Sequence, residues 1–141
     1  MRAHATRYSA GMSVGIGGLS GARLIVTIPV RDPERARTFY TDVLGLAFEA
    51  ASAAGILLRA GEGRVLLYPS MAPPPDHTLA GFEVDRLEPV ITTLQARGVV
   101  FEDYDFPTLH TVGHVAWIGP ERAAWFRDSE RNILSISEPW R

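Results

Sequence analysis

Histidine and aspartate are the side chains of this sequence best suited to metal or acid–base chemistry. His110 and His114 are separated by four positions, which would place both on one face of an extended strand, and His77 precedes an apolar segment. Imidazole nitrogens bind zinc and iron, so these three histidines are a candidate metal site. The alternatives are that His77 caps a linker while the other two are partly exposed strand residues, or that the histidines hydrogen-bond a ligand.

Asp103 and Asp105 form a second group that could act chemically, because paired carboxylates can serve as general acid and base. More often such a pair lies in a solvated loop. Ser135 has no base nearby in the sequence and no nucleophile-elbow pattern around it, so we expect it to line a cavity and offer one hydroxyl. Cysteine is absent, which excludes disulfides and thiolate chemistry. The catalytic residues, if there are any, stay unknown.

The composition is that of one globular domain with a sizeable core: 141 residues, 46% hydrophobic and 21% charged, with a formal charge of −2. The sequence has no run of basic residues that would indicate nucleic-acid binding. No apolar stretch reaches the roughly 20 residues that a membrane span requires. We therefore expect a cytoplasmic protein, and the absence of cysteine fits this expectation. The first 21 residues are rich in glycine and serine and predict a flexible arm.

The chain contains an internal repeat. A shift of 53 residues superimposes Asp32 on Asp85, and it also superimposes Gly45 on Gly98. In both copies the aspartate follows an apolar strand and can cap a helix, in the second copy together with Glu88, and the glycine can end that helix. Short strands follow each glycine. The repeat predicts two βαβββ modules, at about residues 22–70 and 79–138, joined by a proline-rich linker at 71–78.

In the second copy we expect strands at VVFEDYD, at about HTVGHVAWI, at RAAWFR and at NILSISE. The fold class is therefore α+β, with residues 22–141 forming a single domain.

Two segments resemble a known superfamily. IPVRDPERARTFYTDVLGLAFE is similar to the opening module of the vicinal oxygen chelate superfamily, and AAWFRDSERNILSISE is similar to its closing hairpin. This group includes glyoxalase I, extradiol dioxygenases and bleomycin-resistance proteins, and the likeness, which covers about residues 22–138, is greatest to small bacterial members of unassigned function. It implies a curved, barrel-like mixed sheet with helices outside. It also implies a homodimer, in which the partner chain completes the cavity.

The closing hairpin departs from the superfamily pattern at two positions. Ser129 stands where a proline is usual, and Arg131 stands where the turn usually has glycine. An arginine with positive φ would be mildly strained.

The resemblance also implies four metal-ligand positions, one on each of four strands. Here these positions hold Ile25, Leu66, Leu79 and Ser135. Three aliphatic side chains and one hydroxyl cannot chelate a divalent cation. We therefore expect no metal at the usual site and no cofactor.

Aromatic residues fall on strands that should build the cavity. Trp125 and Phe126 are adjacent, so one can face the cavity while the other fills the core. Plain core packing is the alternative for each aromatic residue. The ligand-binding residues that we expect are Tyr68, His77, His110, Trp117, Trp125 and Ser135.

The leading hypothesis is a metal-free protein that binds a planar or aromatic organic molecule, as bleomycin-resistance proteins do, so that sequestration of a toxic natural product would give antibiotic resistance. The alternative is a metal-dependent lyase, isomerase or dioxygenase of the glyoxalase type with a displaced metal site. A third reading is a metal-free catalyst that uses a histidine or an aspartate as its base.

Overall fold

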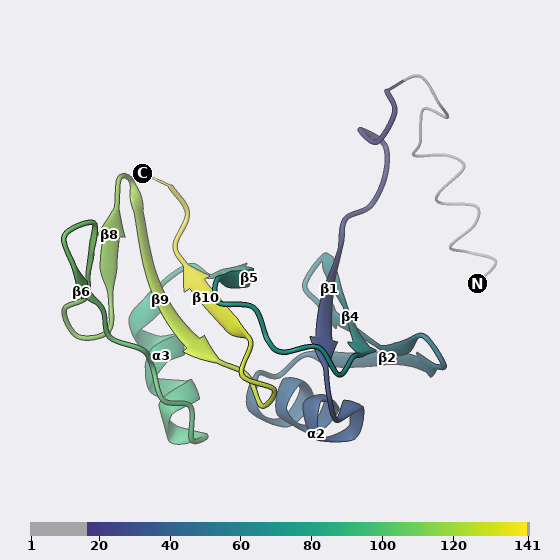
Figure 1. Ribbon diagram of the computed structural model, residues 1–141. Coiled ribbons are helices and arrows are strands. Elements are labelled where there is room, and N and C mark those ends of the chain that lie inside the picture. Colours follow the sequence, from purple (N-terminus) through teal and green to yellow (C-terminus); the bar gives the residue numbers. More distant parts are fainter. Residues whose placement is uncertain (1–16, 141) are drawn as a thin grey trace.

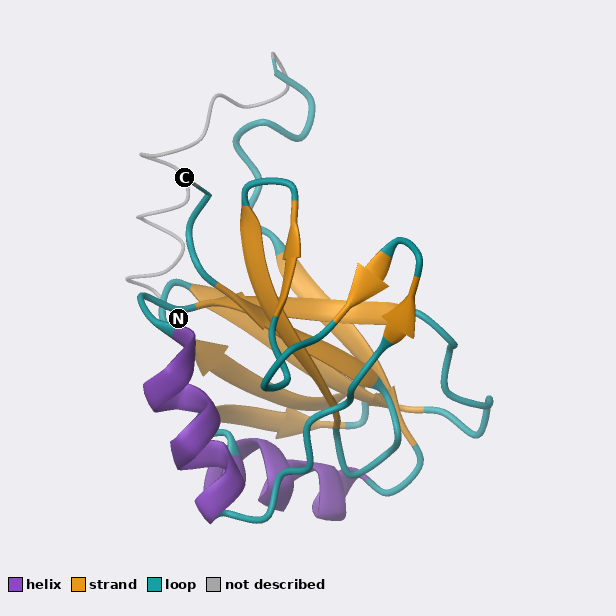
Figure 2. Cartoon of the chain, turned by 90° about the vertical axis from the view of Figure 1, so that its left-hand side faces the viewer, coloured by secondary structure: helices purple, strands orange, loops and turns teal. Residues whose placement is uncertain are grey.

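The computed structural model describes residues 17–140, so most of the predicted arm at residues 1–21 lies outside the described residues. Two four-stranded sheets form the fold, and each module repeats the same order, in which the fourth strand lies between the first and the third. The sheets curve but form no closed barrel. Figure 1 shows them side by side, with β2 and β8 at the outer edges. The helices lie together at one side of the strands (Figure 2). The predicted α+β class is confirmed.

The first sheet has the order β1 (Ile25–Val30), β4 (Gly63–Pro69), β3 (Gly55–Ala60) and β2 (Ala47–Ser52). Strands β1 and β4 are parallel, and the other pairs are antiparallel. Alternation along β1 buries Ile28 and Val30 in the core, because successive strand residues point to opposite faces.

Helix α2 (Pro33–Thr38) begins as the sequence predicts. The Asp32 side chain accepts a hydrogen bond of 3.1 Å from the Arg35 amide, and Pro33 occupies the first turn. The helix continues as a single π-helical turn, η1 (Phe39–Val43), which buries Tyr40 completely. Gly45, with a φ of 83°, then ends the helix in the left-handed conformation that glycine tolerates best.

The second sheet has the order β5 (Thr78–Glu83), β10 (Ile133–Ser137), β9 (Glu121–Arg127) and β8 (Ala116–Ile118). Strand β5 runs parallel to β10, just as β1 runs parallel to β4 in the first sheet. Helix α3 (Leu87–Ala96) follows β5 and buries Leu87, Ile91 and Leu94.

The predicted aspartate cap of α3 is wrong. The helix begins one residue later, with Arg86 at the N-cap and no capping bond from its side chain. Instead, Glu138 from the end of β10 reaches the helix, and its carboxylate accepts a hydrogen bond of 2.9 Å from the Leu87 amide. Arg122 also donates to this carboxylate at 2.9 Å. A distant acid thus satisfies the helix N-terminus, so Asp85 is not needed there.

The segment between α3 and β8 also differs from the prediction. Instead of a long strand from residue 99 to 105, Phe101 makes a single bridge to Phe126, and a short hairpin follows, formed by β6 (Asp105–Phe106) and β7 (Leu109–His110). His114 lies in the next turn with a φ of 71°. His110 and His114 therefore do not share one face of a strand, because Gly113 and His114 reverse the chain between them.

The turn between β9 and β10 joins the two modules. The buried Asp128 carboxylate accepts a hydrogen bond of 2.6 Å from the Tyr40 hydroxyl of η1. The Asn132 amide donates to the Pro29 carbonyl of β1 at 2.9 Å. The contacts join residues that are 88 and 103 positions apart in the chain, and they hold the second module against η1 and β1.

Glu130, in the same turn, lies under the N-terminus of α2. Its Oε1 accepts from the amides of Arg31 and Asp32, both at 3.0 Å, and its Oε2 lies 2.8 Å from Arg35 Nε. Burial opposes ionisation of Glu130, but the hydrogen bonds from Arg35, from the Asp32 amide and from Ser129 outweigh it and lower its pKa to about 2.

Arg131 adopts the left-handed conformation, with a φ of 71°, so the turn keeps this backbone shape although arginine stands where glycine is usual. We expect Arg131→Gly to raise the free energy of unfolding by about 0.5 to 1 kcal/mol, because glycine removes the clash of the side chain with its own backbone. Urea unfolding at neutral pH measures the change. Arg131→Ala is the matched control, since it keeps the β-carbon and should give no such gain. A destabilised glycine variant would contradict the prediction.

The lowered pKa of Glu130 predicts how the stability of the fold depends on pH. A carboxylate whose folded pKa lies near 2, below the ordinary 4.5, stabilises the fold above pH 4.5, and this contribution disappears as the pH falls toward 2. The loss should approach roughly 3 kcal/mol, at about 1.4 kcal/mol per pKa unit. In Glu130→Gln this component should be missing, whereas Glu34→Gln, on the exposed start of the same helix, should keep it. Urea unfolding between pH 6 and pH 2 tests this, and identical profiles for the wild type and Glu130→Gln would refute it.

Candidate functional site

Each sheet has one face against the helices and one face away from them, which we call its open face. On the N-terminal sheet the open face carries every second residue of β1, β3 and β4, namely Ile25, Thr27, Pro29, Leu57, Arg59, Arg64, Leu66 and Tyr68. None of these side chains belongs to the buried core cluster. The face is therefore available to another molecule.

The open face of the N-terminal sheet is built in rows across its strands. Thr27, Leu66 and Leu57 are cross-strand neighbours and form an apolar middle row. Pro29 and Tyr68 form the next row, and Ile25 lies beside the middle row on the other side. Ile25 is 40% exposed and Tyr68 is 36% exposed, so apolar surface remains in contact with water. A flat, apolar ligand laid on these rows would remove that surface from water.

The row that includes Ile25 ends in charged residues. Arg64 pairs with Ile25 on one side and with Arg59 on the other. Glu49 lies between the two arginines, with its Oε1 at 3.1 Å from Arg59 Nη2 and at 3.8 Å from Arg64 Nε. The open face thus changes from apolar to charged along the strands.

On the C-terminal sheet the open face includes Ser135 with its neighbours Gly81 and Trp125. The Gly81 position is tight, because a β-carbon there would lie 2.9 Å from the Ser135 hydroxyl oxygen. The missing side chain leaves space for that hydroxyl. The serine therefore lines this face, as expected from its sequence context, and has no general base among its cross-strand neighbours.

The β6–β7 hairpin covers part of this second open face. Tyr104 packs its ring edge-on to Trp125 at 5.6 Å between ring centroids, and Leu109 joins the same cluster with Ala116 and Ile133. Trp125 is only 7% exposed as a result. Burial, and then the nearby charge of Glu102, raises the pKa of Tyr104, so its hydroxyl stays neutral and can hydrogen-bond a ligand.

The six expected ligand-binding residues do not converge in one chain. Tyr68 lies on the open face of the N-terminal sheet, while Trp125 and Ser135 lie on that of the C-terminal sheet. Trp117 points to the opposite face, since it pairs with Arg122, whose guanidinium lies 5.8 Å from the indole centroid.

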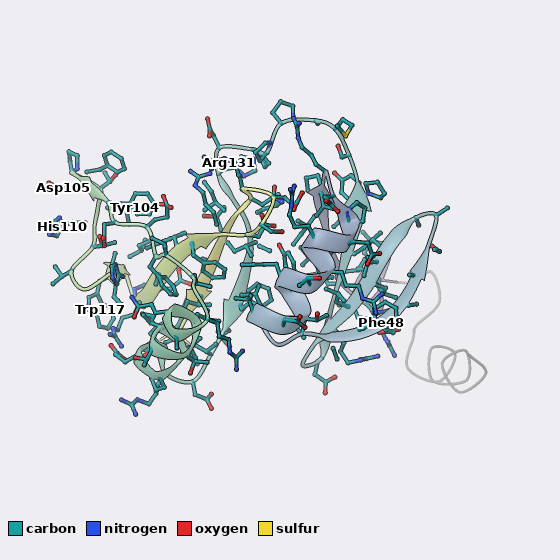
Figure 3. The ribbon with its side chains drawn as sticks, turned by 90° about the horizontal axis from the view of Figure 1, so that it is seen from below. Phe48, Tyr104, Asp105, His110, Trp117 and Arg131 are labelled. Atoms are coloured by element: carbon teal, nitrogen blue, oxygen red, sulfur yellow. The ribbon has the colours of Figure 1, made fainter. Side chains whose placement is uncertain are left out.

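Figure 3 places Trp117, His110 and Tyr104 at one end of the molecule, with Phe48 of β2 at the other. His77, just before β5, is exposed.

His110 and His114 are each held by an aspartate. His110 Nδ1 lies 3.0 Å from Asp105 across the hairpin, and His114 Nδ1 lies 3.0 Å from Asp103. A cavity of about 450 Å³ beside α3 is lined by His114, Arg122 and Glu88 among others. The two carboxylates thus orient imidazoles, and do not form an acid–base pair with each other.

The usual metal positions of the superfamily do not suit a metal in this chain. Ile25 and Leu66 lie on β1 and β4, Leu79 sits at the bulge in β5 and packs against the core, and Ser135 offers one hydroxyl. Within residues 17–140, no three His, Cys, Asp or Glu side chains come together as a metal site would require. The donor set therefore does not fit a divalent ion.

A cavity of about 150 Å³ lies elsewhere, on the core side of the second sheet. Its lining is apolar and includes Leu44, Phe82, Val90 and Phe126. Phe126 and Trp125 point to opposite faces, so this cavity is separate from the open face that carries Trp125 and Ser135. It has no polar group that could orient a ligand for chemistry.

Sequence reasoning missed Thr27, Leu57, Gly81 and Tyr104 as parts of the open faces. The first three follow from the alternation of strand residues once the register is known. No sequence pattern indicated a role for Tyr104, because the β6–β7 hairpin that positions it was predicted as part of longer strands. Among the described residues, no helix is both long and apolar enough to cross a membrane.

Comparison with solved structures finds this fold in several proteins of low sequence identity. A glyoxalase/bleomycin resistance protein/dioxygenase from Alicyclobacillus acidocaldarius has a TM-score of 0.64 at 16% identity, covering 84% of this chain and 92% of that one. TnmS3, an antibiotic binding protein from Streptomyces sp. CB03234, has a TM-score of 0.59 at 20% identity, with coverages of 83% and 94%. Lactoylglutathione lyase from Agrobacterium tumefaciens has the same score and identity, with coverages of 83% and 92%. No curated protein matches the chain.

A family profile described as the Glyoxalase/Bleomycin resistance protein/Dioxygenase superfamily matches residues 24–134. This range spans both modules, from the start of β1 into β10. It agrees with the repeated strand order and with the resemblance seen in the sequence. The chain therefore belongs to the glyoxalase, bleomycin resistance protein and dioxygenase superfamily.

Proposed function

We propose that this protein binds a planar, largely apolar organic molecule on its open faces, without a metal ion. The observation that carries the proposal is the apolar surface of the N-terminal sheet, where Ile25 and Leu66 stand at positions that hold metal ligands in superfamily enzymes. Burial of this surface supplies affinity at about 25 cal/mol per Å² of apolar area. Tyr68 and the Ser135 hydroxyl would orient the ligand by hydrogen bonds.

A homodimer is part of this proposal. In one chain the two open faces belong to separate sheets, and Figure 1 shows the outer strands β2 and β8 far apart. A second copy that lays its C-terminal open face over the first chain's N-terminal one would enclose a ligand between two walls. Each wall would then contribute part of the site: Tyr68 from one chain, Ser135 and Trp125 from the other.

The biological role that we propose is resistance by sequestration of a toxic natural product. TnmS3, which shares the fold, is an antibiotic binding protein. An apolar site without catalytic groups fits tight binding without turnover. One observation favours a second function, a metal-free acid–base catalyst: Asp103 holds Nδ1 of His114, and His114 lines a cavity of about 450 Å³.

The binding proposal predicts that Leu66→Glu weakens ligand binding. A carboxylate in the apolar middle row would be desolvated by a flat ligand, and this should weaken binding more than about tenfold. A thermal-shift screen with anthraquinone and naphthoquinone natural products identifies a ligand by the rise in melting temperature. Val100→Glu is the control, since Val100 is 80% exposed and lies on neither open face. Equal binding by wild type and Leu66→Glu would place the ligand elsewhere.

The proposal also predicts that purified protein contains divalent metal well below one equivalent per chain. Elemental mass spectrometry after expression in metal-supplemented medium measures the content. Stoichiometric zinc, iron, nickel or manganese that is lost in His110→Ala would contradict the metal-free site and favour the lyase, isomerase or dioxygenase alternative. Addition of a chelator should leave the melting temperature of the wild type unchanged.

A further inference from the structure

The charged end of the N-terminal open face has a composition that the apolar-ligand proposal does not explain. A cavity of about 740 Å³ opens there, lined by Arg23, Leu24, Arg59, Glu62, Gly63 and Arg64. Three of these six residues are arginines, contributed by the segment before β1 and by the two strands β3 and β4.

The arrangement of Arg59 and Arg64 favours an added anion. They are direct cross-strand partners in an antiparallel pair, and like charges placed opposite each other destabilise a sheet. Glu49 lies between them, and its Oε1 is 3.1 Å from Arg59 Nη2 and 3.8 Å from Arg64 Nε. An anion bound between Arg59 and Arg64 would reduce the repulsion of this like-charged pair.

The burial of these groups suits a ligand site better than a plain surface ion pair. The Arg64 side chain is 20% exposed and that of Glu49 is 24% exposed, while the Arg59 side chain remains 42% exposed. The partly shielded Glu49 carboxylate would hold Arg59 in place, and Arg59 also lines the cavity. Charge-assisted hydrogen bonds from guanidinium to an oxyanion gain strength in such a setting, because water competes less.

The geometry points to a ligand that carries an anionic group, a carboxylate or a phosphate, at one end of its planar body. Ile25 links the two parts of the site, since it is the cross-strand neighbour of Arg64 and borders the apolar row of Thr27, Leu66 and Leu57. A molecule laid across these rows would bring its apolar rings onto the leucines and its anion onto Arg59 and Arg64. This inference rests on the proposed function, because it assigns the polar end of the same ligand.

A pair of fluorescent probes tests the inference. The sulfonate 8-anilino-1-naphthalenesulfonate and the neutral N-phenyl-1-naphthylamine share the same rings and differ in the anionic group. We expect the sulfonate to bind at least about tenfold more tightly than the amine. Arg59→Gln should remove this preference while the affinity for the neutral amine stays unchanged. Competition with 1-naphthoate and 1-naphthyl phosphate then shows which of the two anions the site prefers.

Two further variants serve as controls. Glu49→Gln removes the competing carboxylate, so it should tighten sulfonate binding, and it carries the test even if Arg59→Gln does not fold. Arg86→Gln changes the net charge by the same amount as Arg59→Gln but lies at the exposed start of α3, and it should have no effect. Melting curves without probe show which variants are folded.

The outcomes separate this inference from the proposed function. If both probes bind equally and neither Arg59→Gln nor Glu49→Gln alters the ratio, the anion site is wrong while the apolar site stands. If Arg86→Gln weakens sulfonate binding as much as Arg59→Gln, the effect is one of net charge and the site is also wrong. If neither probe binds, the proposed function fails and this inference fails with it.

Discussion

A cluster of buried polar contacts at the turn between β9 and β10 holds the two modules in one structure. Asp128, Glu130 and Asn132 reach from the second module to Tyr40, to the N-terminus of α2 and to the end of β1. Because each carboxylate is buried with several donors around it, removing any one donor would leave a desolvated charge behind. The position of one open face relative to the other therefore depends on a turn that touches no ligand. A buried carboxylate has the same role at the second helix, where Glu138 accepts a hydrogen bond from the Leu87 amide.

The open faces follow from how the core is filled. The helices cover one face of each sheet, and the alternation of strand residues leaves the other face to Ile25, Leu66 and Tyr68 on one sheet and to Ser135 on the other. A chain that placed His or Glu at these positions would have the donors for a divalent ion. Here three of the four usual metal positions present aliphatic carbon instead, and the recognition that we propose therefore rests on burial in place of coordination. The duplication gives the chain two such open faces, each built from strands in the same order.

The repeated modules could be predicted because their signals are local. Asp32 and Gly45 mark the two ends of the first helix by rules that concern only their neighbours, and both were found as expected. The start of the second helix was harder to predict. Its Leu87 amide donates a hydrogen bond to Glu138, a residue 51 positions away that no local sequence pattern reveals. The same holds for the β6–β7 hairpin: its strands are two residues long, too short for alternation to show, and Tyr104 packs on Trp125 through a contact set only by the folded chain. Trp117 was expected to line the cavity together with Trp125, but it pairs with Arg122, three residues before Trp125 on β9, so the two indoles point to opposite faces.

The β6–β7 hairpin has no counterpart in the first module, where β2 follows the helix directly. Two copies that began with the same plan have therefore ceased to be interchangeable. A substitution of Tyr104 or a shorter hairpin would alter the open face of the C-terminal sheet and leave that of the N-terminal sheet unchanged. The hairpin is thus a place where one of two otherwise similar surfaces can be reshaped without disturbing the strands that the modules share.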